Sequence, residues 1–379
     1  MWRCKIFKSK KITNLFYSKM NRGRLADLDV LINKDGANTG KVGLYRDAFY
    51  KKASINEHLF LLRGCEELID NIYLYYDLLS ETGQLQIKRQ ITGSAQPGLN
   101  SNFINYYYIN LPPLPQQKKI AQILSTVDEV IEQTESAIAK YQAIKQGLMH
   151  DLFTRGIDIN TGKLRPSPQD APQLYKESAL GLIPREWEVQ ELGKENETYA
   201  GGTPNRSIDD YYKGEIPWVA SGEVNQSFIF KTKESISSDA LRFSSAKMAP
   251  KESVLIAMYG ATAAQVSMLK IDACTNQAVL AIIPNSLWNN YFIYYGLNYS
   301  KDRILFLAQG SGQPNLNKKM IDTTQFWKPT LAEQKLVVER LGGIESKIQT
   351  EQQALGKYQQ LKAGLMQDLL TGRVGVVVD

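Results

Sequence analysis

Apolar residues recur along two stretches of the chain at alternating spacings of four and three residues, the period of a helical heptad seam. Each stretch begins just after a proline and has a glycine, Gly147 or Gly364, near its end, as is typical of helix boundaries. The pattern therefore predicts two long helices. The residues predicted to form their interface are Ile120, Leu124, Val127, Ile131, Ile138, Tyr141 and Leu148 in the first helix, and Val337, Leu341, Ile344, Ile348, Leu355, Tyr358 and Leu365 in the second.

The two helical stretches are copies of one another. The segment from Pro112 returns from Pro329 with a constant offset of 217 residues, as between Tyr141 and Tyr358. The same offset aligns GSAQPGLN, which starts at Gly93, with GSGQPNLN. A repeat unit of this size indicates duplication of a domain followed by a helix, because solenoid units are far smaller.

Two equal seams, one after each globular domain, can bury each other, and a pseudo-twofold relation between the copies predicts an antiparallel coiled coil. The alternative is that each helix packs only on its own domain. Flanking apolar residues such as Ile144 and Leu361 widen the stripe, so part of each helix is expected to face something other than the second helix. The polar residues Thr134 and Glu351 interrupt both seams near the middle, where such residues commonly fix register.

The remaining segments predict an α+β fold. Strand-like runs lie at 187–192, 216–220, 253–259 and 278–284, and helical spacing returns at 287–299 and 302–307. The expected organisation is a first domain at 1–110, a helix at 111–157, a linker at 158–179, a second domain at 180–328 and a final helix at 329–374. The opening motifs of the second domain have no counterpart in the first, which is therefore expected to be incomplete at its front.

Composition and charge exclude several classes of protein. The 379 residues have 45 basic against 39 acidic side chains, and no stretch is apolar enough to cross a membrane. Without a secretory signal, we expect a cytoplasmic, prokaryotic protein with no membrane partner. Eight basic residues fall within positions 1–24, so the rest of the chain has 45 − 8 = 37 basic against 39 acidic residues. Net charge alone therefore does not indicate nucleic-acid binding.

Residues for metal binding or catalysis are scarce. Three cysteines form no CxxC pair, and His58 and His150 are the two histidines of the chain, so we expect neither a metal site nor a catalytic triad. The segment Asp35–Gly43 imitates a phosphate-binding loop. Three residues rather than four separate its glycines, and Val42 stands where Ser or Thr should bind magnesium, so a hairpin turn is expected.

Four glycine- and serine-rich loops of the second domain, at 200–207, 220–227, 259–265 and 309–319, are either plain surface turns or a DNA-recognition surface. Their Asn, Gln, Ser, Thr, Arg and Lys side chains are the types that contact bases and phosphates. The candidate DNA contacts in the second domain are Thr203, Asn205, Arg206, Ser221, Asn225, Gln226, Gln265, Gln313 and Asn315, with Lys213, Lys231 and Lys233 for phosphates. Those in the first domain are Asn38, Lys41, Gln96 and Asn100.

The motifs GLIPREWEVQELG, AGGTPN, IPWVASGEV, GSGQPNLN and LPPLPQQKKIAQIL, with GLMQDLLTGRV at the end, resemble those of specificity subunits of type I restriction-modification systems. The resemblance covers essentially the whole chain. It implies two target-recognition domains, each for one half of a bipartite duplex DNA sequence, separated by an antiparallel helical spacer. A helix of about 35 residues would span about 50 Å, which suits half-sites one to two turns of duplex apart.

The same resemblance implies a non-catalytic subunit that docks two DNA adenine methyltransferase subunits and ATP-dependent restriction subunits. S-adenosylmethionine, ATP and magnesium are then expected on these partner subunits and not on this chain. The sequence has no Asn-Pro-Pro-aromatic tetrad of its own, and LPPLP is expected to introduce a helix. The alternatives are a coiled-coil adaptor between proteins, a non-functional remnant of a specificity subunit and a nucleotide hydrolase, which the spacing of the Asp35 loop disfavours.

Overall fold

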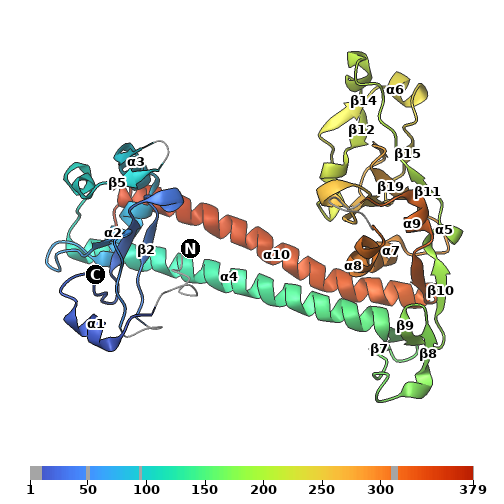
Figure 1. Ribbon diagram of the computed structural model, residues 1–379, viewed down its shortest axis with the longest axis horizontal. Helices are drawn as coiled ribbons and strands as arrows, with labels where there is room; N and C mark the ends of the chain where they lie inside the picture. The colour runs from blue at the N-terminus through green and yellow to red at the C-terminus, as the bar shows by residue number, and fades with distance from the viewer. Residues whose placement is uncertain (1–10, 48–51, 94–95, 309–314, 379) are drawn as a thin grey trace. The chain divides into compact units, whose positions relative to one another are not determined.

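The computed structural model describes residues 11–47, 52–93, 96–308 and 315–378. The chain divides into unit 1, which comprises Met1–Lys140 and Gln349–Asp379, and unit 2, which comprises Tyr141–Ile348. The two long helices, α4 (Leu114–Thr154) and α10 (Leu331–Leu370), belong partly to each unit. Each unit therefore contains a part of both helices beside its own sheet (Figure 1).

Unit 1 is built on a three-stranded antiparallel sheet of order β2-β1-β3. Its strands are β1 (Val30–Asn33), β2 (Val42–Leu44) and β3 (Leu59–Leu62). The turn between β1 and β2 contains the short 3-10 helix Gly36–Asn38, which begins at a glycine with φ +77. The phosphate-loop imitation at Asp35–Gly43 is thus a hairpin turn, as expected.

Helices α2 (Asn71–Leu79) and α3 (Glu81–Arg89) complete the core of unit 1. Asp70 caps α2, because its Oδ1 accepts hydrogen bonds of 2.9 Å from the backbone nitrogens of the second and third residues of the helix. Tyr73 and Tyr76 of α2 are buried against the sheet and against Leu124 of α4. The smaller elements of unit 1 are α1 (Asn14–Lys19), β4 (Ile91–Thr92) and β5 (Gly98–Leu99).

Unit 2 contains two larger sheets, a five-stranded one of order β11-β19-β16-β17-β13 and a four-stranded one of order β14-β12-β18-β15. Most neighbours are antiparallel, but β12–β18 and β13–β17 are parallel. The strands are β11 (Thr198–Ala200), β12 (Ile216–Val219), β13 (Phe228–Ile229), β14 (Glu234–Ile236), β15 (Met248–Ala249), β16 (Val254–Ala257), β17 (Val266–Leu269), β18 (Ala273–Thr275) and β19 (Val279–Ile282).

The remaining elements of unit 2 join its sheets to the long helices. They are the two-stranded pairs β6 (Ile157–Asp158) with β7 (Lys163–Leu164), β8 (Tyr175–Ser178) with β9 (Gly181–Pro184), and β10 (Glu188–Glu191) with β20 (Gln325–Lys328), and the helices α5 (Leu192–Glu195), α6 (Ser238–Arg242), α7 (Asn290–Tyr299), α8 (Lys301–Leu307) and α9 (Lys318–Asp322). The four predicted strands and two predicted helices of this unit are all present. The short helices α5, α6 and α9 were not predicted, because four or five residues are too few to show a helical period.

The internal repeat is visible in the topology. In unit 1, the sheet order β2-β1-β3 is followed along the chain by α2 and α3, and in unit 2 the order β17-β16-β19 is followed by α7 and α8. Both hairpins turn through a 3-10 helix that begins at a positive-φ glycine, Gly36 or Gly260. The mixed α+β fold with two related units is confirmed.

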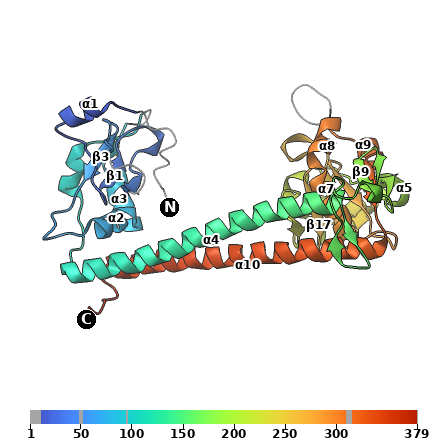
Figure 2. The same cartoon turned by 90° about the horizontal axis from the view of Figure 1, so that it is seen from below.

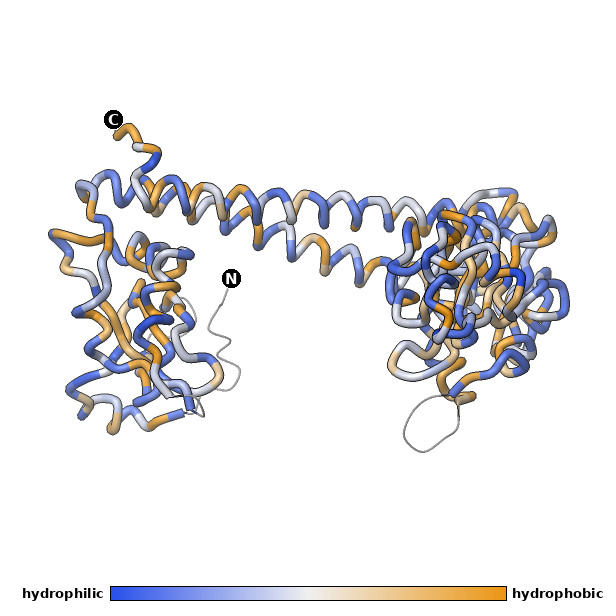
Figure 3. Tube along the Cα trace, turned by 90° about the horizontal axis from the view of Figure 1, so that it is seen from above, coloured by the Kyte–Doolittle hydropathy of each residue, from blue (hydrophilic) through white to orange (hydrophobic). Residues whose placement is uncertain are grey.

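The two long helices pack together, as predicted. Within each unit, the parts of α4 and α10 that belong to it lie side by side (Figures 1 and 2), and apolar positions recur along both helices (Figure 3). Buried members of the seam are Ile120, Leu124, Ile131, Ile138, Val337, Leu341 and Ile348, and half-buried members are Val127, Tyr141, Leu148, Ile344, Leu355, Tyr358 and Leu365. As the wide stripe predicted, the seam also faces the domains: Leu124 belongs to the core of unit 1 and Leu341 to that of unit 2.

A buried polar contact fixes the helix pair in unit 1. Lys362 Nζ of α10 lies 2.6 Å from Asp128 Oδ1 of α4, and the Tyr76 hydroxyl donates to Asp128 Oδ2 at 2.8 Å. The Lys362 ammonium also lies over the Tyr76 ring, 5.4 Å from its centroid. Along α4 from Asp128 to Lys145, the ion-pair partners on α10 run backwards from Lys362 to Glu345, so the helices are antiparallel.

The corresponding contact in unit 2 uses the repeat-related residues. Lys145 Nζ of α4 lies 3.0 Å from Glu345 Oε1 of α10, and the Tyr295 hydroxyl donates to Glu345 Oε2 at 2.6 Å. Lys145 and Glu345 are offset by 217 from Lys362 and Asp128, respectively. The same lysine, carboxylate and tyrosine network therefore occurs once in each unit, with the roles of the helices exchanged.

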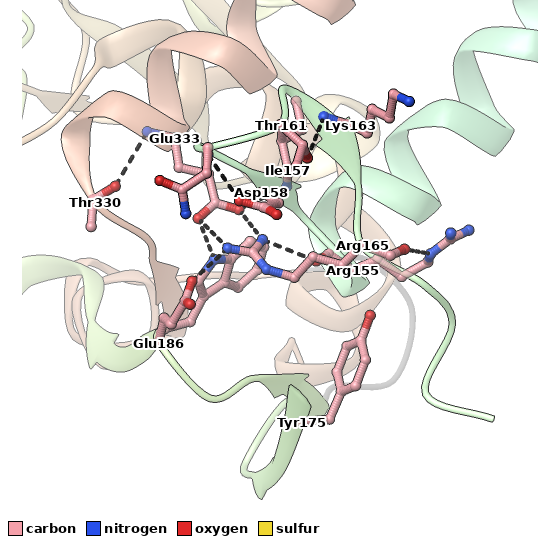
Figure 4. Close-up of polar contacts among 12 residues, drawn as sticks. Arg155, Ile157, Asp158, Thr161, Lys163, Arg165, Tyr175, Glu186, Thr330 and Glu333 are labelled. Carbon is pink, nitrogen blue, oxygen red and sulfur yellow. Dashed lines mark hydrogen bonds and ion pairs between the residues drawn. The ribbon is translucent and has the colours of Figure 1, made fainter. Parts of the chain in front are cut away.

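The segment for which a linker is expected, 158–179, contributes to the interior of unit 2. Arg165 is 5% exposed, and its guanidinium contacts Glu333 of α10 at 2.5 and 3.1 Å and Glu186 at 2.7 Å (Figure 4). Glu333 also accepts from the Trp187 indole at 3.0 Å and from the backbone nitrogen of Ile157 at 2.8 Å. This buried network connects the end of α4 to the start of α10.

Candidate nucleic-acid interface

The loop that follows β11 carries the first group of candidate contacts, and two glycines set its path. A Cβ on Gly201 would lie 2.0 Å from the carbonyl oxygen of Thr275, and one on Gly202 would lie 2.3 Å from Ser245 Oγ. The Gly202 carbonyl accepts a 3.0 Å hydrogen bond from the Trp218 indole. The AGG of the AGGTPN motif therefore allows close backbone packing, which positions the polar residues that follow it.

Arg206 is the basic residue of this loop, and contacts with neighbouring side chains hold its guanidinium in place. Its guanidinium lies 2.8 Å from Glu234 Oε2 and stacks over Tyr212, 4.1 Å from the ring centroid. The hydrogen bond to Glu234 raises the pKa of Arg206 above its ordinary value. The side chain is 54% exposed, so the guanidinium is oriented by the ring and still reaches the surface.

The other candidates of this loop also have partners within the protein. The Thr203 hydroxyl donates to Gln277, and Asn205 Oδ1 accepts from the backbone nitrogen of Ser207 at 3.0 Å. Lys213 pairs with Asp210 at 2.9 Å on the exposed surface. The side chains of the loop are therefore held in defined positions rather than extended freely into solvent.

A buried carboxylate positions the next candidates. Glu223, 6% exposed, accepts hydrogen bonds from the backbone nitrogens of Ala220 at 3.1 Å and Lys233 at 2.9 Å. It thereby links the turn that contains Ser221 to the segment that carries Lys231. The ammonium groups of Lys231 and Lys233 form no ion pair with any other described residue and remain available for phosphate.

The candidates next to the five-stranded sheet are distant in sequence from the loop of Arg206. They also lie beside other elements. Asn225 and Gln226 precede β13, and the Ser267 hydroxyl of β17 donates to the Gln226 carbonyl. Gln265 precedes β17 at the β16–β17 turn, where Tyr259 forms a β-bridge with Asn315. The predicted contact Gln313 lies outside the described residues.

Three of the four candidates of unit 1 lie on or beside its β1–β2 turn. Asn38 Oδ1 accepts a 2.6 Å hydrogen bond from Lys41 Nζ. The Thr39 hydroxyl donates to the Pro97 carbonyl at 2.9 Å, which brings the turn to the segment of Gln96. Asn100 instead caps the next 3-10 helix, with Oδ1 accepting from the Asn102 nitrogen at 3.0 Å. The same pair of segments meets in unit 2 at the bridge of Tyr259 and Asn315.

Sequence reasoning missed two exposed aromatic side chains. Phe230 and Phe243 are 69% and 64% exposed, next to Lys231 and Arg242 in sequence. The Arg242 guanidinium lies 5.3 Å from the centroid of the Phe243 ring. Exposed phenylalanine beside cations is suited to stacking on bases or inserting between them. The clusters FIFKTK and LRF carried this signal in the sequence.

The net charge of this region is balanced. Residues 199–280 contain eight basic and eight acidic side chains, and three of the cations are ion-paired with Glu234, Asp210 and Glu252. Any attraction to DNA must therefore come from local groups rather than from a broad positive field. Within the described residues, there is no cluster of three or more potential metal ligands and no helix that could span a membrane.

Comparison with known proteins decides the family. The family model described as the type I restriction modification DNA specificity domain matches residues 2–141 and 184–362. The chain belongs to this family of specificity subunits. A putative MjaX specificity subunit of Methanocaldococcus jannaschii is 29% identical over 84% of this chain and 72% of its own. The MjaVIII specificity subunit of the same organism is 26% identical over 92% of this chain and 79% of its own.

Solved structures show the same fold. The S subunit of a type I restriction-modification system from M. genitalium has a TM-score of 0.58 and 16% identity, over 92% of this chain and 84% of that one. A chain from a study of type I R-M complex assembly has a TM-score of 0.56 and 16% identity, over 93% and 84%. The resemblance predicted from the motifs is confirmed. The expectation of a non-catalytic subunit is likewise confirmed by the names of the relatives, which are specificity subunits.

Proposed function

We propose that this specificity subunit recognises a bipartite duplex DNA target, with one half-site for each unit, and docks two methyltransferase subunits and the restriction subunits of a type I complex. The observation that carries the proposal is the internal repeat: two units of related topology share one antiparallel helix pair and repeat the same lysine, carboxylate and tyrosine network. In this proposal, S-adenosylmethionine, ATP and magnesium belong to the partner subunits.

The DNA contacts of unit 2 are assigned to the loops around Arg206, Ser221 and Lys233. Support comes from the stacked guanidinium of Arg206, which has donors for a guanine edge, and from the lysines near it, which suit phosphates. Base contacts specify sequence, whereas phosphate contacts contribute affinity on any sequence. Recognition of a defined half-site therefore rests on Arg206 and its polar neighbours more than on Lys231 or Lys233.

The docking of two like partners is assigned to the exposed sides of α4 and α10. Gly147 and Gly364 occupy repeat-related helical positions, and a Cβ on either would meet no atom within 4 Å. Glycine costs a helix about 0.5 to 1 kcal/mol relative to alanine, and no contact within the described residues requires it here. Ile144 and Leu361, three residues earlier, are 44% and 52% exposed. Two like faces that permit close approach suit two copies of one partner.

Co-expression with a methyltransferase subunit of the same system tests the proposal as a whole. Mapping methylated adenines across the host genome should give a split motif with a fixed gap. Absence of methylation, while a complex of the two proteins is recovered, would leave only the docking part of the proposal standing.

Binding of duplex DNA by that complex separates the proposal from the alternative of a protein adaptor, which the balanced charge favours. Contact with several phosphates should give a steep loss of affinity with added salt. Arg206→Ala should cost about 1 to 3 kcal/mol on the cognate site and relax specificity there. The control Lys194→Ala removes an exposed cation of α5 instead. An equal loss on random DNA would reject base recognition by Arg206.

A further inference from the structure

The five-stranded sheet of unit 2 gathers several loops at one of its ends. Ala257 at the end of β16 pairs with Val279 at the start of β19. β11 is antiparallel to β19 and ends beside its start, with Ala200 opposite Leu280. β17 is antiparallel to β16 and begins beside its end, and β13 runs parallel to β17 from the same end. The loops that follow β11, precede β13 and join β16 to β17 therefore leave the sheet together.

The loop of Arg206 and the β16–β17 turn are neighbours at this end, because both contact the segment that enters β19. The Thr203 hydroxyl donates to Gln277. The next residue, Ala278, accepts at its carbonyl a 2.8 Å hydrogen bond from the Met258 nitrogen. The segment before β13, which carries two further candidates, leaves the sheet at the same end. Candidates that are distant in sequence therefore share one end of unit 2.

Unit 1 builds the corresponding end of its sheet on the same backbone frame. Its β1–β2 turn runs from Asn33 to Lys41, and the β16–β17 turn of unit 2 runs from Ala257 to Gln265. The nitrogen of the first residue donates to the carbonyl of the last at 2.8 Å in unit 1 and 3.0 Å in unit 2. The nitrogen of the second residue donates to the carbonyl of the residue before β3 or β19, at 2.8 Å in both. The two turns therefore have the same hydrogen-bond pattern.

The frame is kept even where it strains the backbone. The eighth residue of the turn has φ +83 in unit 1, where it is Gly40, and φ +58 in unit 2, where it is Ala264. A positive φ is uncommon for residues other than glycine. Unit 2 therefore retains the shape of the turn without the residue best suited to it.

Side chains on this frame are the same where they are buried and different where they reach the surface. Residues 30–32 and 254–256 are both Val-Leu-Ile and are buried. At exposed or half-buried positions, unit 1 has Asp35, Asn38, Lys41 and His58, where unit 2 has Tyr259, Thr262, Gln265 and Ala278. One backbone frame therefore presents two different sets of chemical groups.

The long helices show the opposite behaviour. Several of their exposed positions keep the same residue in both copies of the repeat, as in the pairs Lys140 and Lys357, Gln142 and Gln359, and Gly147 and Gly364. A surface that binds the same partner twice keeps its residues, whereas two surfaces that bind different ligands diverge. Two half-sites of different base sequence are such ligands.

His58 is held in place at the turn of unit 1. Its Nδ1 lies 2.9 and 3.0 Å from the two carboxylate oxygens of Asp35, whose backbone forms a β-bridge with Gly98. The imidazole side chain is 56% exposed, and its nitrogens can donate to or accept from a base edge. The ion pair therefore presents an oriented polar ring on the same turn as Asn38 and Lys41.

We propose that the β1–β2 turn together with His58 in unit 1, and the β16–β17 turn in unit 2, are equivalent specificity elements, each of which contacts the bases of one half-site. The inference rests on the proposed function and names the side chains that make the half-sites differ. These are Asp35, Asn38, Lys41 and His58 in unit 1 and Tyr259, Thr262 and Gln265 in unit 2. Because bases are distinguished by their donors and acceptors, a change of these groups on a constant frame changes the preferred bases.

An exchange of side chains on the constant frame tests the proposal in the complex of the full chain with the methyltransferase subunit of its system. The variant combines Asp35→Tyr, Asn38→Thr, Lys41→Gln and His58→Ala, the residues that the frame carries in unit 2. Mapping of methylated adenines across the host genome should show a new sequence in one half of the split motif, with the other half and the gap unchanged. Methylation at the original sites should fall by about tenfold or more, because a single wrong base pair has an effect of that order on affinity.

Glu66→Gln combined with Glu67→Gln is the matched control, because these exposed side chains follow β3 at the opposite end of the sheet. The control should leave the motif and the extent of methylation unchanged. His58→Ala alone repeats the test with one exposed side chain, so the test does not depend on the folding of the fourfold variant. Recovery of the complex with the methyltransferase shows that a variant is folded.

The outcomes separate this inference from the function on which it rests. If the unaltered chain gives a split motif and both turn variants give the same motif to the same extent as the control, the inference is overturned and the proposed function stands. A change in both halves or in the gap also overturns it, because each turn is assigned to one half. So does loss of the complex by a variant with an unaltered circular dichroism spectrum, which would assign the turn to a protein partner. Absence of a split motif for the unaltered chain would reject the proposed function, and this inference with it.

Discussion

The guanidinium of Arg165 forms two hydrogen bonds to the carboxylate of Glu333, 168 positions along the chain and on the first turn of α10. Both side chains are at most 6% exposed. Breaking a buried pair by removing one charge leaves the other charge without compensation, which costs about 3 to 5 kcal/mol.

Glu333→Gln is therefore expected to lower the free energy of unfolding of unit 2 by several kcal/mol, although glutamine is isosteric. The repeat counterpart of Glu333 is Gln116, so the variant gives unit 2 the residue of unit 1. Urea denaturation monitored by tryptophan fluorescence measures the change, because Trp187 donates to this carboxylate. Glu339→Gln, on an exposed position of α10, is the matched control. A loss no greater than that of the control would contradict the role assigned to the pair.

The lysine networks of the helix pair predict an asymmetry between the units. Lys362 contacts an aspartate whose side chain is 3% exposed, whereas Lys145 contacts a glutamate that is 19% exposed. Because the cost of an uncompensated carboxylate grows with burial, Lys362→Met should destabilise by about 2 to 4 kcal/mol, more than Lys145→Met. Lys357→Met serves as an exposed control on α10. Equal effects of the two substitutions in thermal unfolding would argue against this explanation.

In the proposed interface, Glu234 would compete with DNA for Arg206, because the two side chains form an ion pair at 2.8 Å. Glu234→Gln removes the charge of the ion pair and frees the guanidinium, which remains stacked on Tyr212. We expect tighter binding to duplex of any sequence and a steeper dependence on salt, because one more cation then reaches phosphates. Glu215→Gln removes an exposed charge of the same unit without touching Arg206. Fluorescence anisotropy at several salt concentrations checks the result, and identical behaviour of the two variants would count against a role for the ion pair.

Phe230 and Phe243 are predicted to contact bases. Because both rings are exposed, Phe230→Ala and Phe243→Ala should change stability by less than about 0.5 kcal/mol. Each should weaken DNA binding by about 1 to 3 kcal/mol if its ring stacks on a base. Phe306→Ala, 77% exposed on α8, is the matched control. DNA affinity that is unchanged by both substitutions would remove these rings from the interface.

Asp77 of α2 predicts a pH dependence of stability. Burial raises the pKa of its carboxyl from 3.8 to about 6, against the opposing effect of the hydrogen bond that it accepts from the Tyr107 hydroxyl at 2.6 Å. The folded state therefore holds this proton more tightly than the unfolded state. The resulting stabilisation is full below pH 3.8 and is lost as pH rises through about 6.

Asp77→Asn keeps an acceptor for Tyr107 without the charge. At pH 7, it should raise the free energy of unfolding by about 2 to 3 kcal/mol, and it should flatten the fall in stability between about pH 4 and 6. Glu129→Gln, on the exposed side of α4, should do neither. Denaturation curves across this pH range measure both effects, and a parallel pH profile for Asp77→Asn and the unaltered chain would contradict the assignment.

The helix pair was predictable because its signal is periodic and local. Ile131 and Ile138 repeat at the heptad spacing whatever surrounds them, and the internal repeat doubled the signal. The hairpin at Asp35–Gly43 followed from loop spacing alone. In contrast, nothing near Arg165 in the sequence indicates that its partner is Glu333, so the segment 158–179 was expected to be a linker.

The candidate contacts were predicted less fully than the fold. Residue type pointed to Arg206, but its stacking on Tyr212 and its ion pair with Glu234 depend on how distant segments fold together. Several motifs of the resemblance hold the scaffold instead: Gly202 allows close packing and Glu223 ties two turns together. Exposure, which singles out Phe230, is a property of the folded chain and not of its sequence.

The exchange of roles between the two polar networks has a consequence for the origin of the chain. Each network takes its lysine from one copy of the repeat and its carboxylate and tyrosine from the other. A polypeptide with one copy would carry both halves of the contact, and two such polypeptides could satisfy each other across a twofold axis in an isologous dimer. The fused gene would then have inherited an interface that was already self-complementary, and each copy became free to diverge on its own.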